Sequence, residues 1–310
     1  MEFRHVPVLF RETIDSLEIR PDGVYADCTA GGGGHSAAIA QRLTTGRLIA
    51  VDRDPDAIET LTARFRDKPN VTVVHENFLR IEAIRAQYAP AGFDGILADL
   101  GVSSHQLDTP GRGFSFHADA PLDMRMSREG KSAYDVVNTY DEADLRRILY
   151  AYGEEKCAPS IARRIVAERQ KKPIETTLEL AELVKTAIPA KMRREGGHPA
   201  RRTFQAIRIE VNGELQFLDD AVHAMFASLK VGGVLSVITF HSLEDRIVKN
   251  AFRSLTQGCT CPSFFPVCTC GKTPAGELTN RGVGPGDAEL EENPRARSAR
   301  LRSIRKLKEA

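Results

Sequence analysis

The chain has 310 residues, of which 42% are hydrophobic and 27% are charged, a composition typical of a soluble globular protein with one large domain or two ordinary ones. Its net charge of +1 excludes a protein that is basic as a whole, so any binding to nucleic acid would depend on local patches. An apolar run of 18 residues and an apolar N-terminal leader are both absent from the sequence, and we therefore expect a cytoplasmic protein that does not contact a membrane.

The first clear element is a strand followed by a glycine turn. Residues 24–27 are a β-prone run that ends in Asp27, and residues 31–34 are four consecutive glycines. Small apolar residues at helical spacing follow, and the next strand, 47–51, is followed by Asp52. Glycine lets the backbone adopt a positive φ and lets a ligand approach the helix N-terminus closely. The pattern therefore predicts a βαβ unit of the nucleotide-binding type.

Two classes of cofactor fit this unit. A dinucleotide would place its pyrophosphate at the glycine turn, where the negative charge of Asp27 would repel it. S-adenosylmethionine has no phosphate, and its ammonium and sulfonium groups would be attracted by the same acid. Asp52 would accept hydrogen bonds from the ribose hydroxyls of either cofactor. The two acids together favour S-adenosylmethionine, with a nicotinamide dinucleotide, or a glycine turn that binds no nucleotide, as the alternatives.

Two further strands follow in the same half of the chain. Residues 71–74 predict the third strand, and Phe78 after it would either stack on an adenine or pack in the core. Residues 93–99 predict the fourth strand, which ends in Asp99. A polar turn containing Gly101 follows at the carboxyl edge of the sheet, where ligands bind in parallel α/β folds. We interpret this turn as the catalytic loop of an α/β protein with a mostly parallel sheet.

The alternation of strands and helices stops after the catalytic loop. Segments 142–152, 158–169 and 177–188 each carry apolar residues at helical spacing. The sequence therefore predicts an all-helical insertion that recognises the substrate. The predicted domains are 1–108 and 203–310 for the two parts of the α/β domain, and 109–202 for the helical insertion between them.

The α/β pattern resumes with helices at 204–217 and 219–229. Gly232 and Gly233 are expected to separate the second helix from a strand at 234–240. A cluster of ionisable residues follows that strand, and polar clusters at this edge of a sheet usually face a ligand. The candidate residues in this cluster are His241, Glu244 and Asp245.

A group of four cysteines and a basic C-terminus end the chain. Four thiols within twelve residues, Cys259, Cys261, Cys268 and Cys270, could bind zinc, because thiolates suit a tetrahedral site. Their C-x-C spacing is tighter than the usual C-x₂-C, so reduced thiols in a loop are the alternative. Seven basic residues lie between positions 295 and 308, and we interpret them as a basic C-terminal tail, either solvated or in contact with nucleic acid.

Several longer motifs together resemble one known family. They include the turn at 27–36, Asp-Leu-Gly-Val-Ser-Ser at 99–104, Pro-Leu-Asp-Met-Arg-Met at 121–126, His-Pro-Ala-Arg-Arg-Thr-Phe-Gln-Ala at 198–206 and Asn-Pro-Arg-Ala-Arg-Ser at 293–298. These motifs extend over nearly the whole chain. On their basis the sequence resembles the bacterial ribosomal RNA small subunit methyltransferase H family, also called MraW.

The resemblance implies a Rossmann-like, S-adenosylmethionine-dependent methyltransferase with a helical insertion. It implies transfer of a methyl group to N4 of a cytidine in the decoding region of 16S rRNA, within the small ribosomal subunit. The cofactor contacts that the resemblance implies are Gly33, Gly34, His35, Asp52, Phe78, Asp99 and Gln106.

The proposed chemistry suggests roles for further residues. The cytosine amino nitrogen is a poor nucleophile, and an acceptor for its N–H protons would assist its attack. Asp99 is our catalytic candidate, with cofactor binding alone as the alternative. The target base must leave its stack to react, and the protein must also hold the RNA backbone. The candidates for substrate binding are Phe114, Phe116, Asp123, Arg125, Arg201 and Arg202, together with His241, Glu244 and Asp245.

Three other classes of protein remain as alternatives. A non-catalytic RNA-binding ribosome assembly factor would need the basic patches but no cofactor. A methyltransferase of another nucleic acid, such as a DNA amino-methyltransferase, would be expected to have a Pro-Pro-aromatic turn after the fourth strand, where this chain has Leu100-Gly101-Val102. A nicotinamide dehydrogenase is disfavoured by the charge of Asp27.

Overall fold

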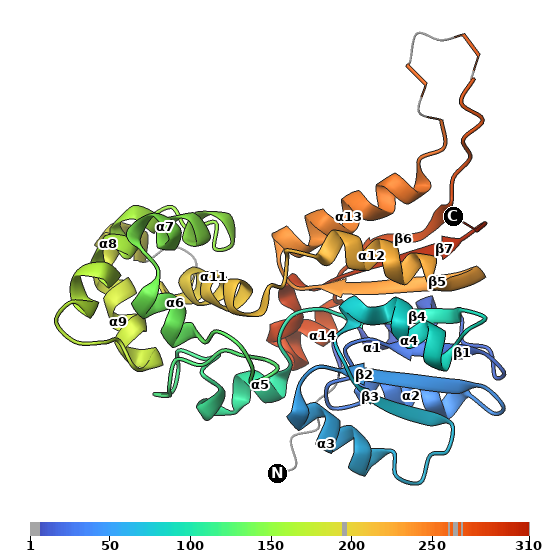
Figure 1. Cartoon of the computed structure of the whole chain (residues 1–310), viewed down its shortest axis with the longest axis horizontal. Helices are drawn as coiled ribbons and strands as arrows, with labels where there is room; N and C mark the ends of the chain where they lie inside the picture. Colours follow the sequence, from blue (N-terminus) through green and yellow to red (C-terminus); the bar gives the residue numbers. More distant parts are fainter. Residues whose placement is uncertain (1–6, 194–196, 260, 263–265, 268, 310) are drawn as a thin grey trace. The chain divides into compact units, whose positions relative to one another are not determined.

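The computed structural model describes residues 7–193, 197–259, 261–262, 266–267 and 269–309. The chain divides into two compact units. One, here called the α/β unit, comprises Met1–Gly101 and Leu215–Ala310, and the other, the helical unit, comprises Val102–Glu214 (Figure 1). The helical unit extends beyond the predicted range 109–202 at both ends.

A seven-stranded sheet forms the centre of the α/β unit, with strand order β3-β2-β1-β4-β5-β7-β6. Strands β1 to β5 pair in parallel, whereas β7 is antiparallel to both of its neighbours. This arrangement confirms the predicted α/β class with a mostly parallel sheet. The bounds are Val24–Asp27 (β1), Arg47–Asp52 (β2), Val71–His75 (β3), Phe93–Asp99 (β4), Leu229–Thr239 (β5), Gly276–Val283 (β6) and Arg300–Lys306 (β7).

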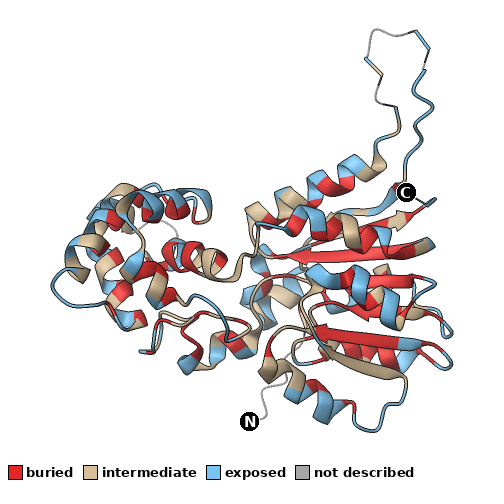
Figure 2. Ribbon diagram, viewed as in Figure 1, coloured by how far each residue is buried: buried red, intermediate tan, exposed pale blue. Residues whose placement is uncertain are grey.

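Helices cover both faces of this sheet. One face packs on α1 (Phe10–Ser16) and α2 (Gly34–Arg42), and the other on α4 (Ile81–Tyr88), α12 (Leu218–Ala227) and α13 (Ser242–Thr256). Alternate residues of β4 therefore enter different cores, with Ile96 on one side and Leu97 on the other. Cover on both faces explains why residues 93–98 of this strand are all buried, as Figure 2 shows. The remaining elements are α3 (Pro55–Arg64), α14 (Asp287–Glu292) and the 3₁₀ turns η1 (Phe78–Arg80) and η3 (Pro294–Ser298).

The C-terminal part of the sheet corrects two predictions. Strand β5 begins at Leu229, so Gly232 lies inside the strand, with φ +87°, beside a register shift against β4. The predicted basic tail is wrong for residues 300–306, because they form β7 between β5 and β6. Its buried residues include Leu301 and Ile304, and buried Lys306 donates from Nζ to the carbonyl of Leu229 at 2.7 Å. The dense basic residues concealed a strand pattern.

The helical unit has its own apolar core, to which Leu145, Ile161 and Ile207 contribute. Its elements are α5 (Ser104–Asp108), η2 (Pro110–Arg112), α6 (Ala133–Thr139), α7 (Glu142–Ala151), α8 (Ala158–Arg169), α9 (Thr177–Ala187), α10 (Ala190–Arg193) and α11 (Arg201–Asn212). Helix α11 was predicted at the start of the second α/β part, but its buried residues belong to the helical core. Among the described residues, no helix is both long and apolar enough to cross a membrane.

Candidate active site

The glycine turn follows β1, which pairs with β2 on one side and β4 on the other. The order of the strands reverses at this point of the sheet. This is the position at which open α/β sheets bind ligands. Gly33 has φ +78°, and a side chain there would lie 3.0 Å from the side chain of Leu61 in α3. At Gly34 an added Cβ would lie 2.3 Å from Cγ of Pro7. The turn therefore requires glycine at both predicted cofactor positions, for backbone conformation and for packing.

Asp27 lies beneath this turn and is 1% exposed. Its carboxylate accepts a hydrogen bond from Ser36 Oγ at 2.6 Å and one from the Thr29 N–H at 3.3 Å. Burial raises the pKa of Asp27 to about 6. The side chain thus ties the end of β1 to the first turn of α2.

Asp52, at the end of β2, holds the other side of the turn. Its Oδ2 accepts a hydrogen bond from the Gly31 N–H at 2.8 Å, and its Oδ1 accepts one from the Asp54 N–H, also at 2.8 Å. Burial raises the pKa of this carboxyl group. Because each carboxylate oxygen can accept more than one hydrogen bond, Asp52 can position the turn and still bind a ligand hydroxyl.

Asp99, at the end of β4, has a buried carboxylate oxygen without a hydrogen-bond partner among the described residues. Its N–H donates to Thr29 Oγ1 at 2.6 Å, and its Oδ2 lies 3.8 Å from Nδ1 of His35. Oδ1 is buried, and none of the described residues forms a hydrogen bond with it. Burial raises the pKa of Asp99 well above its usual range, and the negative charges of Asp27 and Glu244 raise it further. A hydrogen-bond donor from a bound molecule would satisfy this oxygen.

The cluster after β5 is held by its own hydrogen bonds. Glu244 is 1% exposed, and its Oε2 accepts from the N–H groups of Phe240 at 2.8 Å and His241 at 3.3 Å. His241 in turn caps α13 by accepting from the Glu244 N–H at 3.4 Å. Asp245 forms two hydrogen bonds with the guanidinium of Arg302 in β7, at 2.8 and 2.9 Å. Sequence reasoning missed Arg302, because it had placed this residue in a tail.

Two other predicted cofactor contacts also have local structural roles. Phe78 begins η1 and packs, partly buried, against the core that contains α4 and α12. Gln106 lies in the helical unit, where it and Ser103 form a capping box at the start of α5, with hydrogen bonds of 3.0 and 3.2 Å. Their contacts with a cofactor stay predictions.

An aromatic stack lies on the helical unit. Phe116 stacks on His198, with the ring centroids 4.4 Å apart. The ring centroid of the next residue, His117, lies 4.6 Å from that of Phe116. Phe204 of α11 packs against Phe116 edge-on at 5.3 Å. Both histidines are exposed, whereas Phe114, the other predicted aromatic, is buried in the helical core. Sequence reasoning missed the two histidines, although His198 opens one of the family motifs.

The predicted basic residues of this unit differ in their contacts. The Arg125 guanidinium binds Asp123 through Nε at 3.1 Å and through a terminal nitrogen at 2.6 Å, so these two candidates are paired with each other. Arg201 and Arg202 are exposed in the first turn of α11, and Arg202 also donates to the Glu154 carbonyl at 3.1 Å. Arg201 and Arg202 are therefore the better placed to meet an anionic ligand.

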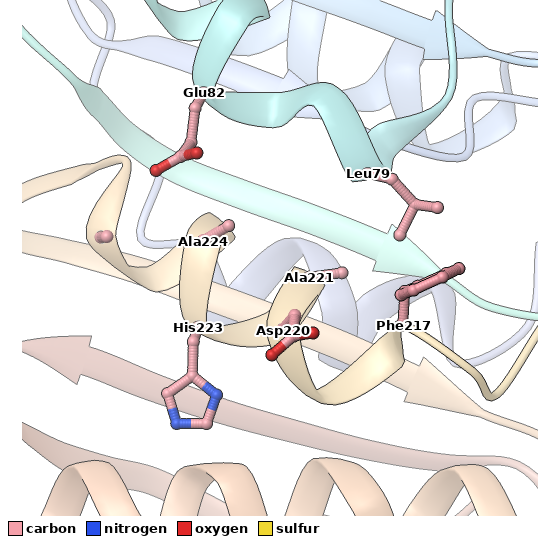
Figure 3. A pocket seen from close by; sticks show the side chains of 8 residues that line it. Leu79, Glu82, Phe217, Asp220, Ala221, His223 and Ala224 are labelled. Carbon is pink, nitrogen blue, oxygen red and sulfur yellow. The ribbon is translucent and has the colours of Figure 1, made fainter.

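A hollow of about 550 Å³ lies elsewhere on the α/β unit, between α4 and α12 (Figure 3). Leu79, Phe217, Asp220 and His223 are among the residues that line it. None of the predicted site residues is in its lining, so the hollow is separate from the candidate active site.

Comparisons with known proteins show the family of this chain. The MraW methylase family matches residues 2–307. The chain is 55% identical to Ribosomal RNA small subunit methyltransferase H of Clostridium botulinum (strain Kyoto / Type A2) over 310 residues, which cover 99% of this chain and 100% of that protein. It is 51% identical to the protein of the same name from Lachnospira eligens over 311 residues, covering 99% of both. The chain therefore belongs to the MraW methylase family.

Proposed function

We propose that this protein transfers a methyl group from S-adenosylmethionine to N4 of a cytidine in the decoding region of 16S rRNA. Family membership supports methyl transfer, and the names of the relatives point to RNA of the small ribosomal subunit. The observation that carries the proposal is the set of three acids, Asp52, Asp27 and Asp99, at the carboxyl ends of the adjacent strands β2, β1 and β4, respectively. Such a substrate would place the protein in the cytoplasm, where ribosomes are.

The three acids suit a cationic cofactor better than a phosphate-bearing one. A pyrophosphate would meet the repulsion of three carboxylates, whereas an ammonium or sulfonium group would be attracted. Asp52 would accept from the ribose hydroxyls, and the open Oδ1 of Asp99 would accept from a donor of the cofactor or of the target base. Gly33, Gly34 and His35, at the start of α2, would contact the cofactor, and Phe78 would border the adenine.

The protein's part in catalysis is chiefly to hold two reactants in line. S-adenosylmethionine, when bound, supplies the methyl group and leaves as the neutral thioether. Orientation of the reacting groups can supply about 7–11 kcal/mol of the rate enhancement. Asp99 would accept an N–H of the cytosine amino group and stabilise the positive charge that develops on its nitrogen. The raised pKa of Asp99 makes its carboxylate a better proton acceptor than an ordinary aspartate.

The helical unit would provide the RNA contacts. The exposed ring of His198, stacked on Phe116, and the exposed ring of His117, tilted against Phe116, offer a surface on which an unstacked base can rest. Arg201 and Arg202 on α11 would bind phosphates, which makes the affinity for RNA dependent on salt. Phe114 is omitted from this proposal because it is buried, and Arg125 because it is paired with Asp123.

The deciding experiment offers tritiated S-adenosylmethionine to purified small subunits and to naked 16S rRNA, followed by nuclease digestion and identification of the labelled nucleoside. We expect N4-methylcytidine from one target position, and loss of the label with Asp99→Asn. Labelling of a different nucleoside, or of DNA in preference to RNA, would contradict the proposed substrate. Tight binding to subunits without any label would favour the assembly-factor alternative.

A further inference from the structure

The connection between α13 and β6 is an unusually long loop. Residues 257–275 contain no helix or strand among those the structure describes, and this loop extends beyond the end of α13 (Figure 1). Its base is closed by a hydrogen bond from the Ala275 N–H to the Leu255 carbonyl at 2.9 Å. The Leu307 N–H also donates to the Ala275 carbonyl, at 2.8 Å. A loop of this length without secondary structure of its own is uncommon in a compact domain unless it has a function.

Three thiols meet in this loop. One ligand atom from each of Cys259, Cys261 and Cys270 lies within 4.8 Å of the others. The sulfurs of Cys259 and Cys270 are 3.8 Å apart, far longer than the roughly 2.05 Å of a disulfide. Around a tetrahedral zinc ion with Zn–S bonds of about 2.3 Å, neighbouring sulfurs lie about 3.8 Å apart. The observed separation is a hydrogen-bond distance between two thiols, and it also equals the separation expected of two sulfur ligands on one zinc ion.

A backbone hydrogen bond is directed at one of these sulfurs. The Cys261 N–H donates to Sγ of Cys259 at 3.3 Å. Metal ligands are commonly held in place by such hydrogen bonds from neighbouring groups. Sγ of Cys261 lies 3.7 Å from the hydroxyl of Thr269, which fixes the opposite side of the loop. Both arms of the loop thus contribute to the cluster.

The other described cysteines have a different setting. Cys28 and Cys157 are buried among apolar residues, as expected of cysteines that pack in a core. Cys259 and Cys270 are exposed and Cys261 is half-buried, so packing does not explain why three thiols gather there. Soft sulfur ligands in a tetrahedral arrangement select zinc among the common divalent ions.

We propose that the thiolates of Cys259, Cys261 and Cys270 bind one zinc ion, which organises the loop between α13 and β6. Each thiol gives up its proton to solvent when it binds. The predicted fourth ligand, Cys268, lies outside the described residues, and the spectroscopic count below decides between a thiol and a water molecule at the fourth position. The ion would add stability to a loop in which most of the described residues are exposed.

The test measures metal in the full-length protein, purified without an affinity tag or chelators. Elemental analysis is expected to give one zinc per chain. Replacement by cobalt should produce sulfur-to-metal charge-transfer absorption, whose intensity counts the bound thiolates. Cys259→Ser with Cys270→Ser should abolish both signals, whereas the control Cys157→Ala, which lies outside the loop, should retain them.

Loop folding gives an independent measurement that does not require any variant to fold. In the wild-type protein, removal of zinc by a chelator should speed trypsin cleavage after Lys272 at least tenfold, and added zinc should restore protection. The proposal is overturned by protein that lacks zinc and gives no thiolate absorption with cobalt. A Cys259–Cys270 disulfide in protein isolated under reducing conditions, or zinc retained by the double variant, would overturn it as well.

Discussion

The carboxyl edge of the sheet and the aromatic stack of the helical unit are built by opposite means. Asp27 and Glu244 at the sheet are about 1% exposed and are fixed by hydrogen bonds from backbone and side chains. His117, His198 and Arg201 on the helical unit are exposed. The first surface is organised before any ligand arrives, whereas the second would lose side-chain freedom when it binds. Such a division suits a small cofactor at the sheet and a large, charged substrate on the helices.

The organised edge is achieved at a cost in stability. Burial raises the pKa of both Asp27 and Asp99, and the negative charges of Asp27 and Glu244 raise that of Asp99 further, so the ionised forms of these two aspartates are disfavoured in the folded protein. Sites that perform chemistry often retain such unfavourable groups, since their function depends on them. The comparison therefore predicts that changes at the sheet edge alter turnover and stability together, while changes on the helical surface alter only binding.

The largest effect is expected from Asp99→Asn. This substitution keeps the shape of the side chain but removes a proton acceptor, so methyl transfer should fall by roughly 100-fold or more. Cofactor affinity, measured by isothermal titration calorimetry, should change far less. The exposed acid Asp67, changed to Asn, is the matched control in the same unit and should leave turnover unchanged. Loss of cofactor affinity equal to the loss of turnover would instead make Asp99 a cofactor ligand only.

A second test concerns the buried charge of Asp27. Its folded-state pKa of about 6 lies above the unfolded value of about 3.9, so the folded protein binds more protons between these values. The free energy of unfolding therefore falls as pH rises through this window and stays lower above it. Asp27→Asn removes that dependence, and at pH 8 we expect the variant to be more stable by on the order of 2–3 kcal/mol.

Urea unfolding of wild type and Asp27→Asn at pH 4 and pH 8 measures this difference. The comparison of the two proteins cancels the contributions of groups that do not interact with Asp27. The pKa of Asp99, which the charge of Asp27 raises, should fall in the variant and add to the difference in stability at pH 8. Equal stability at both pH values would show that the hydrogen bond from Ser36 outweighs the cost of burial.

Glu244 provides a third test, of smaller size. Glu244→Ala would leave the buried N–H groups of Phe240 and His241 without their acceptor and remove half of a capping box, at a cost of about 2 kcal/mol. Glu244→Gln retains an acceptor oxygen and removes a charge close to Asp99, so it should be the more stable of the two variants. Thermal unfolding of both measures this order. An alanine variant at least as stable as the glutamine variant would mean that the N–H groups of Phe240 and His241 do not depend on an acceptor at position 244.

Features that depend on residues close together in the sequence could be predicted, whereas contacts between distant parts of the chain could not. The glycine turn and the acids at the ends of β1, β2 and β4 were predictable, because short patterns of strand, turn and helix determine them. The family resemblance, borne by motifs along the whole chain, was confirmed by the match over residues 2–307. Local patterns and motifs were thus sufficient for the fold class and the family.

The failures involve partners distant in sequence. Alternation in β7 was concealed because Lys306 is buried, its ammonium bound by carbonyls of the chain near Leu229, nearly eighty residues earlier. The pairing of Asp245 with Arg302, and the stacking of His198 on Phe116, likewise join separate parts of the chain. Periodicity carries no information about such contacts, so residues that build the site from afar are missed.

The smallest effect is expected on the helical surface, from the double variant Arg201→Ala/Arg202→Ala. Each lost phosphate contact should lower the slope of log affinity against log salt by about 0.7–0.9. We therefore expect RNA affinity to fall about tenfold at low salt, with turnover of bound RNA and thermal stability unchanged. The matched control is Arg163→Ala/Arg164→Ala, which removes the same charge from exposed positions of α8. Fluorescence anisotropy across a salt series measures the slopes. If both double variants lose affinity equally, binding depends on the overall charge of the helical unit, and α11 has no special part in it.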